Sequence, residues 1–282
     1  MNFTWRWLLI PLALSSFGSV WSFRPPVAQG PMLINPVQQV ADTNLPLPEA
    51  LQGIETIVVL GDSITQLGGE PGGYVWLLAK TLQDVYPDQN WDVINAGISG
   101  NTTANLRARF AEDVLARSPQ LVIIYIGVND VWHQYYDFAT NQHSPTGDFP
   151  AGVELEEYQA HLEAMIQAAQ AEGIQVLLMS PTPIREVQKR ENEELQAYIA
   201  AMQTLAEKYN YTFVDLYQPF MDAIAAYHTV AGPAQPLLTY DGVHPNPAGN
   251  QLIAYNLLQA LGVPTSVLQT LQLQPCVGMC NF

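Results

Sequence analysis

Short apolar runs alternate with helical patterns along most of this chain, and this alternation constrains the fold more than any other feature. Apolar, β-branched runs that stop at a glycine or a polar residue are typical of buried strands, whereas apolar residues spaced three and four apart mark one face of a helix. Strands that alternate with helices form parallel sheets covered on both faces, through right-handed crossovers. The sequence therefore predicts an α/β fold. The five expected strands are Ile57–Leu60, Trp91–Asn95, Leu121–Ile126, Ile174–Met179 and Thr212–Asp215.

The folded domain is expected to span residues 54–263. The 282-residue chain is 48% apolar and 13% charged, a composition that suffices for one large core. Residues 23–53 carry six prolines and no sustained periodicity, so we expect an extended linker or a wrapping arm there. Residues 264–282 are expected to form a C-terminal tail, in which Cys276 and Cys280 either close a small ring or remain free thiols.

The amino terminus has the pattern of a secretory signal peptide over residues 1–22. Arg6 precedes an apolar stretch from Trp7 to Val20, which is shorter than the roughly 18 apolar residues that a membrane span needs. We therefore expect export to the periplasm or the extracellular space, with the membrane involved only through the signal peptide during export. An uncleaved N-terminal membrane anchor is the alternative.

Charge and histidine spacing exclude several kinds of partner. Ten Lys and Arg against 26 Asp and Glu give a net charge of −16, which repels nucleic acid and anionic membrane surfaces. Two cysteines without a neighbouring histidine do not indicate a zinc site, and the other histidines lack metal-ligand spacing. We therefore expect no nucleic acid, no metal and no other cofactor.

Polar residues follow several of the expected strands, at the sheet edge where α/β proteins bind ligands. Ser63 follows the first strand, Gly100 lies in a glycine-rich loop after the second, and Asn129 follows the third; Asp241 and His244 lie three residues apart in a turn near the end. Each has a plain structural interpretation in isolation. Ser63 would cap a helix, and Asn129 or Asp241 would stabilise a turn.

Together these residues meet the requirements of acyl transfer. A serine becomes a strong nucleophile when an imidazole accepts its proton, and the imidazole needs an acceptor that holds its tautomer and orientation. Asp241 and His244 are neighbours without any long-range pairing. The amide of Asn129 and the backbone N–H groups of Ser63 and Gly100 are candidate donors to an oxyanion, each worth about 3 kcal/mol to the transition state.

Four sequence blocks resemble the signature blocks of the SGNH, or GDSL, hydrolase superfamily. They are GDSIT at 61–65, NAGISGNTT at 95–103, IGVND at 126–130 and DGVHP at 241–245, in the family's order. The resemblance implies a three-layer α/β/α sandwich with a five-stranded parallel, flavodoxin-like sheet. It also implies a serine esterase or acylhydrolase that cleaves carboxylic esters through an acyl-enzyme.

The resemblance also implies a role for each site residue. Ser63 would be the nucleophile, Asp241 the orienting carboxylate and His244 the base, with Ser63, Gly100 and Asn129 as the oxyanion hole. Gly97 competes with Gly100 for the glycine's role. The chain departs from the family at position 101, where an asparagine stands in place of the commoner aspartate.

The segment 131–152 is the long insertion of the expected domain, and its aromatic content argues against disorder. We expect it to be irregular and to form a lid or a wall of the cleft, with Trp132 and His133 lining the pocket; a local mini-core is the alternative. The expected partner is a small-molecule ester, either a lipid, an acylated sugar or a simple ester. The subclasses left open are a carbohydrate O-acetylesterase, a lysophospholipase or a thioesterase, and a catalytically silent secreted binding module is the alternative of another class.

Overall fold

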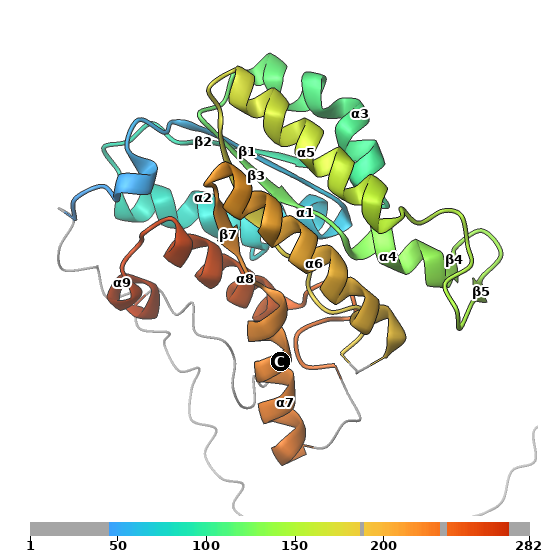
Figure 1. Cartoon of the computed structure of the whole chain (residues 1–282). Coiled ribbons are helices and arrows are strands. Elements are labelled where there is room, and N and C mark those ends of the chain that lie inside the picture. The colour runs from blue at the N-terminus through green and yellow to red at the C-terminus, as the bar shows by residue number, and fades with distance from the viewer. Residues whose placement is uncertain (1–44, 187–188, 232–235, 271–282) are drawn as a thin grey trace, which may run out of the picture. The chain divides into compact units, whose positions relative to one another are not determined.

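The computed structural model describes residues 45–186, 189–231 and 236–270 (Figure 1). The expected signal peptide, residues 23–44 of the expected arm, and residues 271–282 of the expected tail, with Cys276 and Cys280, lie outside the described residues. Within the described ranges, no helix has both the length and the apolar character needed to cross a membrane.

Five parallel strands form the central sheet in the order β2-β1-β3-β6-β7. This is the strand order of the flavodoxin-like doubly wound sheets. Each strand lies within two residues of its expected bounds, so the predicted parallel sheet is confirmed. The strands are β1 (Thr56–Gly61), β2 (Asp92–Gly97), β3 (Leu121–Tyr125), β6 (Gln175–Met179) and β7 (Thr212–Val214).

Helices cover both faces of the sheet, and Figure 1 shows the two groups on opposite sides. Contacts join α3 to α5, α5 to α6 and α4 to α6 on one face, and α1 to α2, α2 to α8, α7 to α8 and α8 to α9 on the other. The three-layer α/β/α sandwich is therefore confirmed. The first group is α3 (Thr103–Asp113), α4 (Val128–Tyr135), α5 (Leu155–Ala171) and α6 (Arg190–Tyr209). The second is α1 (Ser63–Gly68), α2 (Tyr74–Val85), α7 (Tyr217–Ala231), α8 (Pro247–Ala260) and α9 (Thr265–Thr270).

The packed body extends beyond the expected range of 54–263. Leu51, in the short 3₁₀ helix Glu49–Leu51, is fully buried, and Leu45 packs against the same core. At the other end, Leu268 in α9 is also fully buried. These apolar side chains belong to the core because burying them removes surface from water, although prolines interrupt their local periodicity.

The expectation of an irregular segment over residues 131–152 is wrong in its first part. Val128, Val131 and Tyr135 recur at spacings of three and four and are buried, so the chain continues as α4 to Tyr135. A two-stranded hairpin of β4 (Tyr136–Asp137) and β5 (Gln142–His143) follows. The remainder of the segment is irregular.

Gly97 is required where the end of β2 meets α1. A Cβ atom at this position would lie 2.1 Å from the backbone nitrogen of Gln66, closer than any side chain tolerates. Asn95 reinforces the contact because its Nδ2 donates to the carbonyl of Thr65 at 2.7 Å and its Oδ1 accepts from the Gly97 N–H at 2.9 Å. Gly97 therefore fixes the position of the helix that begins at Ser63.

Candidate active site

Ser63 lies at the carboxyl end of β1 as the first residue of α1. The N-cap of this helix is Asp62, whose side chain accepts from the Ile64 N–H at 2.9 Å. The alternative interpretation of Ser63 as the capping residue is therefore wrong, because its neighbour already satisfies the helix terminus. The Ser63 hydroxyl remains available for a partner outside the helix.

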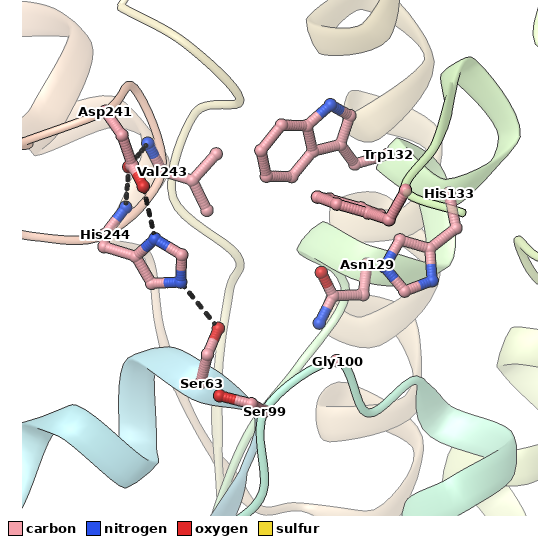
Figure 2. Close-up of a pocket in the computed structure, with 10 residues that line it drawn as sticks. Ser63, Ser99, Gly100, Asn129, Trp132, His133, Asp241, Val243 and His244 are labelled. Carbon is pink, nitrogen blue, oxygen red and sulfur yellow. Dashed lines mark hydrogen bonds and ion pairs between the residues drawn. The ribbon is translucent and has the colours of Figure 1, made fainter. Parts of the chain in front are cut away.

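That partner is His244, which in turn contacts Asp241 (Figure 2). Nε2 of His244 lies 2.9 Å from the Ser63 hydroxyl oxygen, and Nδ1 lies 2.6 Å from a carboxylate oxygen of Asp241. The structure thus brings together a hydroxyl, an imidazole and a carboxylate in a continuous hydrogen-bonded row. Ser63 and His244 are 181 residues apart in the sequence, so the fold supplies this contact.

Hydrogen bonds keep Asp241 ionised. Partial burial disfavours the charged form, but the His244 ring and the backbone N–H groups of His244 and Val243 donate to the carboxylate and hold the pKa of Asp241 below its ordinary value. The two backbone bonds are 2.8 and 3.0 Å long. A carboxylate that is charged and fixed can orient the imidazole and stabilise its protonated form.

The candidate oxyanion donors lie on the opposite side of Ser63 from His244. Asn129 follows β3 in the first turn of α4, and its Nδ2 donates to the backbone carbonyl of Asn101 at 2.9 Å. An amide nitrogen carries two hydrogens, so this bond orients the group and leaves one hydrogen for a second acceptor. Gly100 borders the same pocket with a φ of +76°, whereas Gly97 is packed against α1. The geometry therefore favours Gly100 over Gly97 as a donor.

Arg109 holds the loop that carries Gly100, a function that the sequence did not indicate. Its Nε donates to the side-chain oxygen of Asn101, and one of its terminal nitrogens donates to the Gly61 carbonyl, both at 2.8 Å. The arginine therefore ties the loop after β2 to the end of β1. Its spacing of four from Asp113 predicts an ordinary helix ion pair, which is present but gives no indication of the longer-range bonds.

Two buried carboxyl groups lie beneath the site. Asp130 accepts from the N–H and the hydroxyl of Thr103, at 2.9 and 2.5 Å, and its second oxygen has no partner among the described residues. Burial, only partly opposed by Thr103, raises the pKa of Asp130 to about 7. Burial also raises the pKa of Asp62 to about 6, against the opposing effects of the Ile64 N–H and His244.

A cavity of about 460 Å³ opens over Ser63 (Figure 2). Trp132 and His133, the two residues expected at the pocket, line it, and Phe138 adds a third aromatic ring to form an aromatic wall. Burial lowers the pKa of His133, so the neutral ring is favoured. The complete lining is Ser63, Ser99, Gly100, Asn129, Trp132, His133, Phe138, Asp241, Val243 and His244.

The rings of the aromatic wall also contact one another. The ring of Phe138 makes edge contacts with Trp132, His133 and Tyr136, at centroid distances of 5.3, 5.4 and 4.7 Å. Side chains at the end of α4 attach this segment to α6. Gln134 donates to the Tyr198 hydroxyl at 2.9 Å, and the Tyr135 hydroxyl donates to Glu194 at 2.5 Å.

The structure contains no candidate metal cluster of three or more His, Cys, Asp or Glu side chains within residues 45–186, 189–231 and 236–270.

Solved structures that resemble this chain include two acetylxylan esterases. The chain matches a catalytic mutant of Axe2, an acetylxylan esterase from Geobacillus stearothermophilus, with a TM-score of 0.64 and 33% identity, covering 74% of this chain and 95% of that one. The acetyl xylan esterase AlAXEase matches with a TM-score of 0.63 and 29% identity, over 73% of this chain and 98% of that one. Catalytic mutants of Axe2 have a serine, an aspartate or a histidine replaced by alanine. The fold and the similarities define a hydrolase that acts on ester bonds.

The sequence comparisons identify the family. The profile of the GDSL-like Lipase/Acylhydrolase family matches residues 59–252, and this chain belongs to that family. The acetylxylan esterase of Geobacillus stearothermophilus is 34% identical over 221 residues, which cover 74% of this chain and 94% of that protein. Esterase TesA of Pseudomonas aeruginosa is 28% identical, over 73% of this chain and 88% of its own length. The predicted membership of the SGNH superfamily is confirmed.

The raised pKa of Asp130 predicts a pH dependence of stability. The pKa is about 7 in the folded chain against an ordinary value of 3.8, so the folded state binds this proton more tightly than the unfolded state. The resulting stabilisation is fully present below about pH 4 and is lost as the pH rises to about 7, by up to about 1.4 kcal/mol per pH unit. In Asp130→Asn this part of the decrease in stability with rising pH should be absent. The measurement is the free energy of unfolding in urea between about pH 4 and 7.

Asp88→Asn is the matched control because Asp88 is exposed. If the stability of Asp130→Asn fell with pH as steeply as that of the parent and of the control, the assignment of a raised pKa to Asp130 would be refuted.

Proposed function

We propose that this protein is a serine esterase in which Ser63, His244 and Asp241 form a catalytic triad. The observation that carries the proposal is the hydrogen-bonded row from Ser63 through His244 to Asp241, with distances of 2.9 and 2.6 Å. In such a row the imidazole is within reach of the hydroxyl proton, and the carboxylate fixes the tautomer that leaves Nε2 free to accept it.

The reaction passes through an acyl-enzyme. His244 accepts the Ser63 proton while the Ser63 oxygen attacks the ester carbonyl carbon, and the carbonyl oxygen becomes an oxyanion. The backbone N–H groups of Ser63 and Gly100 and the side chain of Asn129 donate to that oxygen. The intermediate collapses as His244 returns the proton to the departing alcohol. Water, deprotonated by His244, then attacks the acyl carbon. The bond from that carbon to the Ser63 oxygen breaks, His244 returns the proton to the Ser63 oxygen, and the carboxylic acid is released.

Ser63→Ala tests the mechanism. The substitution removes the nucleophile but not the fold, so we expect hydrolysis of p-nitrophenyl acetate to fall by at least about 10⁴-fold with an unchanged thermal midpoint. A fluorophosphonate probe should label the parent and not this variant. Ser99→Ala is the matched control, since Ser99 borders the same pocket outside the hydrogen-bonded row; it should keep its labelling.

Turnover retained in folded Ser63→Ala would refute the triad. A parent protein that neither turns over any ester nor reacts with the probe would instead support the catalytically silent binding module.

Acetyl groups on a carbohydrate are the substrate that we propose within this class, ahead of a lysophospholipid or a thioester. Two observations favour it. The curated relative of 34% identity over 74% of this chain is an acetylxylan esterase. In addition, Phe138 is 58% exposed at the cavity although three other rings hold it in place. A fixed, exposed ring is a suitable stacking surface for the apolar face of a sugar.

A substrate series tests this assignment. We expect kcat/KM to be highest for acetylated xylo-oligosaccharides and to fall as the acyl chain of p-nitrophenyl esters lengthens. Phe138→Ala should raise KM for the acetylated oligosaccharide by about fivefold, or ~1 kcal/mol, and leave KM for ethyl acetate unchanged. Val230→Ala, an 89% exposed position on α7, is the control. A preference for long acyl chains or for a lysophospholipid would overturn the carbohydrate assignment.

We also propose that the enzyme is exported, through residues 1–22, to the periplasm or the extracellular space, where it acts on neutral esters. The alternative is an N-terminal anchor. The net charge of −16 agrees with a neutral substrate, because it disfavours polyanionic partners. N-terminal sequencing of protein recovered outside the cytoplasm should give a first residue close to Phe23; recovery of the intact chain with membranes would favour the anchor.

A further inference from the structure

Asp241 and His244 lie on a segment with little secondary structure of its own. Residues 237–245 form neither a helix nor a strand, and their regular pairing is a single antiparallel bridge between Thr239 and Pro245. Triad geometry must nevertheless be held to about 0.5 Å for efficient catalysis. The groups that hold this segment therefore decide how well His244 meets Ser63.

Glu186, in the connection between β6 and α6, is the group with the most bonds to this segment. Its side chain is 6% exposed. One carboxylate oxygen accepts from the Leu238 N–H at 2.7 Å and from the Thr239 N–H and hydroxyl, each at 2.8 Å. The other oxygen accepts from the Leu237 N–H. Successive backbone N–H groups of this kind form an anion-binding nest.

The nest is connected directly to the turn that carries the triad residues. The Thr239 hydroxyl donates to Glu186 and accepts from the Gly242 N–H at 3.1 Å. Next to Glu186, the Arg185 N–H donates to the Gly242 carbonyl at 2.6 Å. Gly242 directly follows Asp241. Its carbonyl is therefore held by the Arg185 N–H, and its N–H is held by Glu186 through the Thr239 hydroxyl.

The other side of the segment is held by the start of α8. The Asn246 side chain donates to the Leu237 carbonyl at 2.8 Å, and its backbone N–H donates to the Leu238 carbonyl at 2.9 Å. Carbonyls of the segment are thus bonded to Asn246, while its N–H groups are bonded to Glu186. The ion pairs among the described residues do not include Glu186, so backbone dipoles and a hydroxyl compensate its charge.

We infer that Glu186 is a positioning residue, which holds the Asp241–His244 turn so that the imidazole reaches Ser63. The inference rests on the proposed triad. Glu186 acts through Thr239 and Gly242, and it touches neither the substrate nor the reacting atoms. A carboxylate suits this role because both of its oxygens only accept hydrogen bonds, and all four of its partners donate.

Glu186→Gln tests the inference with little change in shape. Its amide nitrogen cannot accept, so in either orientation an N–H group faces an N–H group of the nest. We expect kcat for p-nitrophenyl acetate to fall by about tenfold or more, because small misplacements of catalytic groups are costly. KM should stay within about twofold, since the cavity lining is untouched. Glu193→Gln, at an exposed position of α6, is the control and should retain the parent kcat.

A proton NMR signal distinguishes positioning from general destabilisation. The hydrogen shared by His244 Nδ1 and Asp241 should give a far-downfield resonance in the parent and in Glu193→Gln. We expect it to be broadened or lost in Glu186→Gln while the thermal transition shows that the variant is folded. A folded Glu186→Gln with the parent kcat and the parent resonance would overturn the inference, whatever the result for Ser63→Ala.

Thr239→Val provides a second variant if Glu186→Gln does not fold. It removes the hydroxyl that joins Glu186 to Gly242 and leaves the backbone bonds of the nest in place. A lower kcat with a weakened downfield resonance in this folded variant supports the inference. A folded Thr239→Val with the parent kcat and the parent resonance would overturn the inference. If Ser63→Ala is inactive while both variants match the parent, the triad stands and only the role of Glu186 fails.

Discussion

Backbone pairing of β1 with both of its neighbours is the interaction on which the candidate site depends. The register aligns Gly61 with Gly97 of β2 on one side and with Tyr125 of β3 on the other. Because the three strands are parallel, the segments that follow them all leave the sheet at the same edge. The turn with Ser63, the loop with Gly100 and the helix with Asn129 therefore begin side by side. A shift of one residue in either register would separate Ser63 from the proposed oxyanion donors.

The polar groups around this edge are joined into a frame rather than left as separate contacts. Arg109 links the loop of β2 to the end of β1, and Asp130 binds Thr103 at the start of α3. Glu186 extends the frame to the turn that brings His244. Burying carboxyl groups in this way is costly, as the raised pKa values of Asp62 and Asp130 indicate. In return, the buried carboxyl groups hold the backbone next to the site: Asp62 caps α1, and Asp130 binds the start of α3.

The sequence was informative where the signal is local, and less so where packing decides. All five strands, the sandwich and the family followed from apolar runs and four short blocks. The cap of α1 could not be read from the sequence, since Asp62 and Ser63 are both good capping residues and only the fold shows that Asp62 is the cap. Arg109 and Glu186 could not be found, because their partners are distant in sequence or are backbone groups, which leave no trace in residue identities.

The aromatic wall comes from one continuous stretch of chain between β3 and α5. The rings of Trp132, His133 and Tyr136 contact the ring of Phe138, Trp132 also packs against the main core, and polar bonds to α6 attach the stretch to the body. None of these four rings comes from the central sheet, the Asp241–His244 turn or the loop with Gly100. Under the proposed function, acyl or sugar preference in this scaffold is thus separable from its chemistry. Exchange of a single segment between relatives, with the residues that face α6 retained, would transfer selectivity without rebuilding the catalytic machinery.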